Sequence, residues 1–334
     1  MNRISGQSCL DTGFRPTGDL PDAQSVQNTA LIQLAHALKS EGYHHTAVTP
    51  STHACVNSRP GNERAVNLEG VFGWSRPFYP SAVPREIFEL MQAAEIIASH
   101  EMGWRSLLRA STLNNQLFFH SAYPTVEADA VFFGPDTYRF AAAIEHQLDI
   151  SSAPVLRAVD IGCGAGPGAI AVAGRNPSAE VLAVDINDSA LRLTGINAYV
   201  SGVANVAPCY SDLLHSVEGM FDLIIANPPY LVDPARRAYR HGGGARGSGL
   251  SLDIVDAALQ RLNPGGALLL YTGTAIINGV DRFRLAVERK LRDSGVQWRY
   301  TEIDPDVFGE ELSCSAYADA DRIAALTLLI NQAK

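Results

Sequence analysis

Short apolar runs alternate with amphipathic stretches along the second half of the chain. The apolar runs, rich in β-branched residues, are 155–162, 180–187, 206–212, 221–229 and 266–273. Between and after them, apolar residues recur at helical spacing in 166–177, 188–202, 250–263 and 280–295. Strands that alternate with helices in this way form a parallel sheet covered by helices. The pattern therefore predicts an α/β domain.

The C-terminal end of this pattern is different. The apolar runs 298–303 and 322–330 are separated by an acidic loop without helical spacing. Two consecutive strands without a helix between them pair antiparallel. We therefore predict a seven-stranded sheet whose last two strands form an antiparallel pair.

The N-terminal part of the chain lacks this alternation. Apolar residues fall at helical spacing in 25–42 and 84–101, and 44–81 is rich in Pro, Gly and Ser. The stretches 104–112 and 116–121 flank Asn114-Asn115 like the arms of a hairpin. We predict two domains: a smaller, mainly helical cap with a β-hairpin linker over 1–125, and the sheet domain over 126–334.

Composition narrows the class of protein. The chain has 334 residues, of which 46% are hydrophobic and 18% charged, and its formal net charge is −9. No apolar run is long enough for a membrane span, which takes about 18 residues, and the N-terminus does not resemble a secretory signal. The five cysteines are far apart and are expected to be free thiols. A cytoplasmic protein is expected, without a membrane partner.

Two kinds of partner are disfavoured by residue patterns. Nucleic acid is not expected, because neutralising phosphates needs clustered Lys and Arg and the net charge is −9. A bound metal is not expected either, since His44, His45, His53 and Cys55 have the spacing of no common zinc site.

The stretch VDIGCGAGPG, 159–168, follows the first apolar run and has glycine at every second position from Gly162 to Gly168. A dinucleotide-binding turn has the spacing G-x-G-x-x-G, and Pro167 stands where its third glycine would be. A nicotinamide enzyme is therefore disfavoured. Glycine allows close approach of a ligand, and the following helix directs backbone N–H groups towards it. We predict a ligand site at this turn.

Two further acids follow later strands. Asp185 lies about 20 residues beyond the glycines, where a carboxylate can accept both ribose hydroxyls of an adenosine. Asp212 follows the third strand, where it can contact the adenine amino group, with Leu213 or Leu214 against the ring. With Asp160, three acids stand at three successive strand ends.

The fourth strand ends in Asn227-Pro228-Pro229-Tyr230. Both prolines fix φ and lack an N–H donor, so the turn is rigid and its carbonyls stay free to accept. The Asn227 side-chain oxygen and the Pro228 carbonyl can hold the two hydrogens of an NH₂ group. We expect Tyr230 to stack on the planar group that carries it.

From about Phe132 to Lys290 the chain resembles the S-adenosylmethionine (SAM)-dependent methyltransferases with an Asn-Pro-Pro-Tyr motif. It is most similar to the HemK-like branch, which methylates the glutamine amide of release factors. The matching stretches are DIGCGAG, VDIN, SDLL, IANPPYL, FFGPDTYRF and HGGGARGSGLSLDIV. The resemblance implies the Rossmann-like fold of class I SAM methyltransferases and SAM as cofactor. The residues expected to contact SAM are Asp160, Gly162, Cys163, Gly164, Gly166, Asp185, Ile186, Asp212, Leu213 and Asn227.

The chain departs from that branch at Tyr271-Thr272-Gly273, where an acid would end the fifth strand, and in its C-terminal tail. The acceptor therefore stays open: a small molecule or a peptide or protein side chain, with a planar amide or amine nitrogen. The loop 236–249, with four arginines, could close over an acidic acceptor. Two other functions stay open: an enzyme that consumes SAM itself and releases methylthioadenosine, and a SAM-binding regulator without turnover. The number of subunits is also open.

Overall fold

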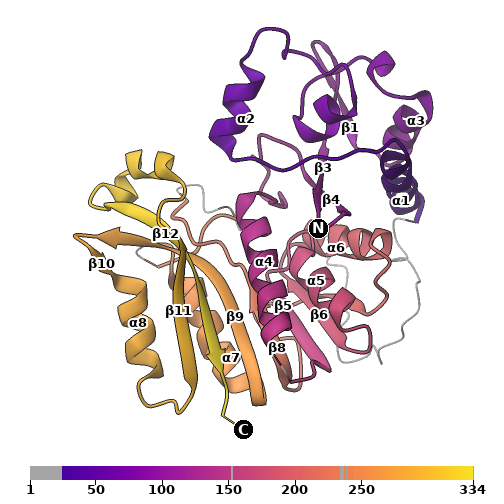
Figure 1. The fold of residues 1–334 in the computed structure, drawn as a ribbon. Coiled ribbons are helices and arrows are strands. Elements are labelled where there is room, and N and C mark those ends of the chain that lie inside the picture. The colour runs from indigo at the N-terminus through magenta and orange to yellow at the C-terminus, as the bar shows by residue number, and fades with distance from the viewer. Residues whose placement is uncertain (1–24, 152, 234–236, 238, 245, 334) are drawn as a thin grey trace, which may run out of the picture.

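The computed structural model describes residues 25–151, 153–233, 237, 239–244 and 246–333. Within these residues the C-terminal part of the chain forms one large sheet (Figure 1). Its strands are β5 (Arg157–Ile161), β6 (Glu180–Asp185), β7 (Val206–Tyr210), β8 (Phe221–Ala226), β9 (Leu262–Ile277), β10 (Val280–Asp281), β11 (Gln297–Asp304) and β12 (Arg322–Asn331).

The order of the strands across this sheet is β11-β12-β9-β8-β5-β6-β7, and the short β10 pairs with β9. Neighbours from β9 to β7 are parallel, whereas β12 is antiparallel to both β9 and β11. The expected class I SAM methyltransferase arrangement, with an antiparallel pair at its end, is therefore confirmed. The order reverses direction beside β5, so the carboxyl ends of β5 and β8 flank a crevice.

Helices cover both faces of the sheet (Figure 1). They are α4 (Pro135–Ile150), α5 (Pro167–Arg175), α6 (Asp188–Val200), α7 (Gly249–Arg261) and α8 (Arg282–Leu291). Successive strand residues point to opposite faces. In β5, Ala158 packs in the core that includes α4 and α5, and Val159 packs in the core that includes α7 and α8. Strands buried on both faces explain the nearly continuous apolar runs of the sequence.

The N-terminal part has a different architecture. Its elements are α1 (Ser25–Ser40), α2 (Pro50–Asn57), α3 (Arg85–Ala93), β1 (Ile97–His100), β2 (Gly103–Ser106), β3 (Leu108–Leu113) and β4 (Gln116–Ser121). The expected hairpin is present as β3 and β4, and Asn114 and Asn115 form its turn with φ of 50° and 62°. Asparagine tolerates this left-handed backbone, which the tight turns of hairpins require.

Two local predictions for this part were wrong. The helix expected over 84–101 ends at Ala93, because Glu95 takes a φ of 56° and the chain then enters β1. The expected loop 44–81 contains α2, which is capped by the Thr49 hydroxyl. Short helical turns also occur at Glu69–Gly73, Pro80–Ala82, Gly309–Ser313 and Ser315–Tyr317.

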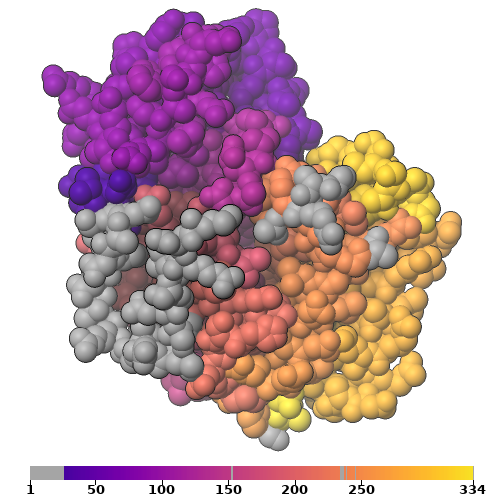
Figure 2. All heavy atoms as spheres, turned by 180° about the vertical axis from the view of Figure 1, so that it is seen from behind, coloured from indigo at the N-terminus to yellow at the C-terminus, as the bar shows by residue number. Residues whose placement is uncertain are grey.

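The cap and the sheet domain share a hydrophobic core. The cap lies at one end of the sheet domain, beside α6 (Figures 1 and 2). Leu193 and Ile196 of α6 belong to the same buried cluster as Leu31 of α1 and Met91 of α3. The architecture changes between Ser121 and α4, but the packing does not stop there. The division at residue 125 stays a prediction.

The cysteines and the apolar helices can be compared with what the composition predicts. Cys55, Cys163 and Cys314 are free, but Cys209 is disulfide-bonded, so the expectation of free thiols throughout was wrong. No helix in the described part of the chain is both long and apolar enough to cross a membrane.

Asn197 of α6 joins the cap to the glycine turn. Its side-chain oxygen accepts from the Phe119 N–H (2.9 Å), and its amide donates to the carbonyls of Phe119 (3.0 Å) and Ala165 (2.8 Å). The side chain is completely buried. One amide therefore satisfies backbone groups of β4 in the cap and of the turn after β5.

Replacing Asn197 by Ala should lower the free energy of unfolding by about 2–4 kcal/mol, because each buried polar group left without a partner costs about 1–3 kcal/mol. Urea unfolding of the whole chain measures this loss. Asn263→Ala is the control, because its part-buried amide makes one bond, to Asp222. Similar losses in the two variants would contradict the role of Asn197 as a junction.

Candidate active site

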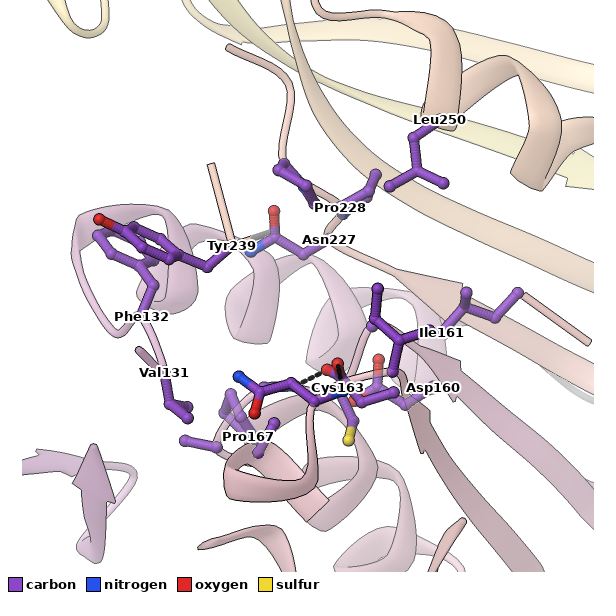
Figure 3. Close-up of a pocket in the computed structure, with 18 of the residues that line it drawn as sticks. Val131, Phe132, Asp160, Ile161, Cys163, Pro167, Asn227, Pro228, Tyr239 and Leu250 are labelled. Carbon is purple, nitrogen blue, oxygen red and sulfur yellow. Dashed lines mark hydrogen bonds between the residues drawn. The ribbon is translucent and has the colours of Figure 1, made fainter. Parts of the chain in front are cut away.

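A cavity open to solvent lies beyond the carboxyl ends of β5, β6 and β8, with an empty volume of about 1060 Å³. Most residues expected in the site line it. They are Asp160, Gly162, Cys163, Gly164, Asp185, Ile186, Asp212, Leu213, Asn227, Pro228 and Pro229. Gly166 and Tyr230 do not line this cavity. In Figure 3, Asn227 and Pro228 lie across the cavity from Asp160, Cys163 and Pro167.

The alternating glycines divide into two pairs with different roles. Gly162 and Gly164 have φ of 73° and 56°, and a Cβ at either position would meet nothing within 4 Å. A Cβ on Gly166 would instead lie 2.9 Å from Thr194 of α6, and one on Gly168 would lie 2.7 Å from Asp160. The first pair therefore leaves room for a ligand, and the second allows close packing of α5.

Asp160 is a buried carboxyl at the wall of the cavity, only 1% exposed. Its Oδ2 accepts from the Ala169 N–H at the start of α5 (2.9 Å). Burial raises the pKa of Asp160 to about 7, and the nearby Asp185 adds to this shift. A cation bound beside it would oppose the shift, because it favours the ionised form.

Asp185 at the end of β6 is held by backbone donors. Oδ2 accepts from the Gly164 N–H (3.0 Å) and Oδ1 from the Asn187 N–H (3.0 Å). Each oxygen keeps a further lone pair that can accept a bond from a ligand. Ile186, next to it, is 51% exposed, and Asp212 is exposed at the same cavity. Carboxylates beside an exposed apolar side chain suit a ribose carrying a flat ring.

Asn227 and Pro228 line the cavity at the end of β8. The Asn227 side chain and the Pro228 carbonyl have no hydrogen bond to any other described residue. Proline at 228 and 229 fixes the backbone between them. Two acceptors are therefore presented on one rigid segment.

Tyr230 is buried, with 6% of its surface exposed, and points away from this cavity. Its hydroxyl donates to Oδ2 of Asp136. Its ring contacts Phe308, with ring centroids 6.0 Å apart. It borders a second, smaller cavity of about 460 Å³, which shares Phe132, Asn227, Pro228, Pro229 and Tyr239 with the first.

Phe132 and Tyr239 are wall residues that the sequence did not single out. Both line the two cavities at their junction with Asn227 (Figure 3). The Tyr239 hydroxyl donates to the Thr125 carbonyl (2.6 Å), which ties this loop to the segment after the cap. Phe132 belongs to the matching stretch FFGPDTYRF, so its sequence position was a usable signal. Tyr239 lies in an arginine-rich loop and had none.

The arginines of that loop are paired within the protein. Arg237 binds Asp233 (2.7 Å), Arg240 binds Glu311, and Arg246 binds Asp319 (2.8 Å). Arg236 lies outside the described residues. The described guanidinium groups therefore attach the loop to the protein's own acids, and no free cation among them awaits an acidic acceptor.

Residues 148–276, from the end of α4 through the cavity walls to β9, match the family model "Methyltransferase small domain". The resemblance inferred from the motifs is confirmed for this part of the chain, which contains the glycine turn, the three acids and the Asn227 turn.

Curated relatives agree with this assignment. A release factor glutamine methyltransferase from Deinococcus radiodurans is 35% identical over 165 residues, which are 46% of this chain and 55% of the relative. A ribosomal protein uL3 glutamine methyltransferase from Neisseria meningitidis is 35% identical over 130 residues, 36% of this chain and 43% of the relative. The chain thus matches about half of the length of these relatives.

One solved structure similar to the chain is a SAM-dependent methyltransferase from Agrobacterium tumefaciens, with a TM-score of 0.43 and 14% identity. The match covers 71% of this chain and 76% of that one.

The raised pKa of Asp160 predicts a pH-dependent stability of the methyltransferase domain. The folded pKa of about 7 exceeds the ordinary 3.8, so the folded state holds a proton that the unfolded state releases. The free energy of unfolding should fall by up to about 4 kcal/mol as pH rises from about 4 to 7, because each pKa unit of the shift contributes about 1.36 kcal/mol. Above pH 7 the contribution of this group should level off. Asp160→Asn should lack this contribution. Urea unfolding of both forms between pH 4.5 and 8 measures the difference, and parallel pH profiles would disprove the shift.

Proposed function

We propose that the protein is a SAM-dependent N-methyltransferase that methylates the carboxamide nitrogen of a polypeptide side chain. The observation that carries the proposal is the Asn227 turn: Asn227 and Pro228 line the cavity, and neither the Asn227 side chain nor the Pro228 carbonyl has a hydrogen bond to another described residue. A carboxamide NH₂ has two hydrogens to donate, so it matches these two acceptors.

The cavity fits SAM by the chemistry of its walls. Asp185 would hold the ribose hydroxyls, and Asp212 with Leu213 and Ile186 would contact the adenine. The open backbone at Gly162 and Gly164 leaves room for the rest of the molecule. Bound SAM supplies an electrophilic methyl group on a sulfonium. A cationic ligand suits a cavity whose acids outnumber its bases, since Asp160, Asp185 and Asp212 line it and none of its described lining residues is Lys or Arg.

The acceptor side supplies orientation. An amide nitrogen is a weak nucleophile because its lone pair is delocalised into the carbonyl. Hydrogen bonds from both N–H groups to Asn227 and Pro228 return electron density to nitrogen and fix its direction. Orientation of this kind accounts for a large share of rate enhancement in group transfer.

A polypeptide acceptor is supported by the shape of the junction and by the relatives. The walls at Asn227 are Phe132 and Tyr239, which suit the apolar stem and flat amide of a glutamine side chain. The relatives are named for glutamine methylation of a release factor and of a ribosomal protein. We place protein ahead of small molecules for this reason.

Asn227→Ala should reduce kcat for methyl transfer by about a hundredfold or more, as expected for the loss of one preorganised polar contact. The affinity for SAM should change little. Transfer of labelled methyl from SAM to peptides with one glutamine, one asparagine or neither measures the rate.

Asn331→Ala, at the end of β12, is the matched control and should keep the wild-type rate. In parallel, the wild-type protein is incubated with SAM but without peptide, and the products are assayed for methylthioadenosine. Rapid methylthioadenosine release without peptide would replace the proposal by SAM-consuming chemistry, and a near-normal rate in Asn227→Ala would remove the assigned role of the turn.

SAM affinity should strengthen as pH rises from 6 to 8, because Asp160, with a pKa of about 7, must lose its proton to favour the cation. The effect should be up to about tenfold over this range, one pKa unit being 1.36 kcal/mol. Calorimetric titration at pH 6, 7 and 8 tests this. Asp160→Asn should bind with an affinity nearly independent of pH, and equal pH profiles in the two forms would refute the coupling.

A further inference from the structure

A buried carboxylate stands behind the Asn227 turn. Asp136, in the first turn of α4, is 4% exposed. Both of its oxygens accept from phenols: Oδ2 from Tyr230 and Oδ1 from Tyr271 (2.8 Å). Arg139 adds a bond to Oδ1 (3.2 Å) and reaches Asp304 with its other nitrogen (2.7 Å). Three donors from α4, β9 and the turn after β8 thus converge on one carboxylate.

The ring of Tyr230 is enclosed as well as hydrogen-bonded. A Cβ at Gly273 would lie 2.2 Å from this ring, so only glycine leaves it room. Phe308 contacts the ring at an interplanar angle of 66°. Tyr230 is therefore fixed in position at both its hydroxyl and its ring, and it does not extend into the cavity beside Asp160.

Two of the residues at which the fifth strand departs from the HemK-like pattern contact Asp136 and Tyr230. An acid was expected at the end of the predicted strand 266–273, and the chain has Tyr271-Thr272-Gly273 there, inside β9, which continues to Ile277. Tyr271 provides a donor and Gly273 provides space, while the acid comes from Asp136 of α4. The negative charge thus lies on a different element, where it meets the tyrosine of the Asn227 turn.

Anchoring Tyr230 also fixes the acceptors two and three residues before it. Pro228 and Pro229 leave few backbone rotations between Asn227 and Tyr230. The Asn227 side chain has no hydrogen bond to another described residue. Its position is therefore set by the chain on either side, which is β8 before it and the Tyr230 anchor after it.

We propose that Asp136 is a positioning residue, which holds the Asn227 and Pro228 acceptors in place through the hydroxyl of Tyr230. The inference rests on the proposed function. It assigns Tyr230 an anchoring role in place of stacking on the acceptor. Asp136 borders the second cavity together with Tyr230, and its role in this scheme is to hold the Tyr230 hydroxyl.

The test compares Asp136→Asn, Tyr230→Phe and the double variant. Asn at 136 keeps one acceptor and so leaves one phenol without a partner, and Phe at 230 removes the hydroxyl alone. Each single variant should lose about tenfold or more in kcat for peptide methylation, since a misplacement of about 1 Å can cost 10²-fold. KM for SAM should stay within about twofold. The double variant should be no slower than the slower single variant, because both changes break one anchor.

Tyr300→Phe is the matched control. The Tyr300 hydroxyl donates to Oδ2 of Asp281 (2.5 Å), a second part-buried phenol–carboxylate pair, which lies between β11 and the start of α8. This control loses the same kind of bond away from the cavity, so its kcat should be unchanged even if its melting temperature falls. Equal losses of kcat in Tyr300→Phe and Tyr230→Phe would show a general effect of stability and overturn the inference.

A measurement without acceptor separates this inference from the proposed function. Hydrogen–deuterium exchange of the segment 221–233 with SAM bound should be faster in Asp136→Asn and Tyr230→Phe than in the wild type and in Tyr300→Phe. A wild-type protein that methylates no peptide refutes the proposed acceptor, and the exchange result then decides the anchoring by itself. Wild-type exchange and wild-type kcat in both anchor variants would refute the positioning role.

Discussion

The turn between β5 and α5 has to be open on one side and tightly packed on the other. On the open side, the backbone of Gly162 and Gly164 borders the cavity. On the packed side, Gly166 and Gly168 allow α5 to lie against Thr194 and Asp160. The same turn offers the Ala165 carbonyl to Asn197, which also holds the cap strand β4. This segment therefore links the cap to the wall of the cavity, in addition to the hydrophobic core that the two parts share.

Electrostatics divides the cavity into two ends. The end at β5 and β6 is acidic, and burial keeps a proton on Asp160 near neutral pH. The end at β8 has the Asn227 turn and aromatic walls, and the two charged residues that line it, Asp136 and Arg240, are each paired within the protein. A cation is favoured at the first end and a neutral, hydrogen-bonding group at the second. This polarity is the physical basis for a cationic methyl donor at one end and an amide acceptor at the other.

The charged groups around the acceptor end form ion pairs within the protein. The loop after Tyr230 is tied to the C-terminal segment by Arg240 with Glu311 and Arg246 with Asp319. In each pair the arginine comes from the loop and the acid comes from the C-terminal segment. The two ion pairs therefore hold the loop and the C-terminal segment together beside the second cavity. Acceptor selection there must depend on shape and hydrogen bonding, since the paired charges are already neutralised.

The sequence by itself determined the sheet, its antiparallel end and the residues around the cavity. Apolar periodicity depends on burial, and burial on both faces of the sheet leaves a strong pattern in the chain. The glycine turn, Asp185, Asp212 and the Asn227 turn are local motifs at strand ends, so parallel strands necessarily bring them together. The motif also includes Tyr230, but no local pattern indicated that its hydroxyl bonds to Asp136.

Only the tertiary structure shows which residues far apart in the chain are partners. Asp136 and Tyr230 are 94 residues apart, and no local pattern shows that a phenol prefers this carboxylate to a ligand. Arg240 and Glu311 are likewise 71 residues apart, and each alone looks like a solvated charge. The helix ends at Ala93, and the exposed Glu95 that follows takes a φ of 56°, which the apolar spacing over 84–101 did not indicate. Interactions between residues far apart in the chain are set by packing, and the order of amino acids records them only indirectly.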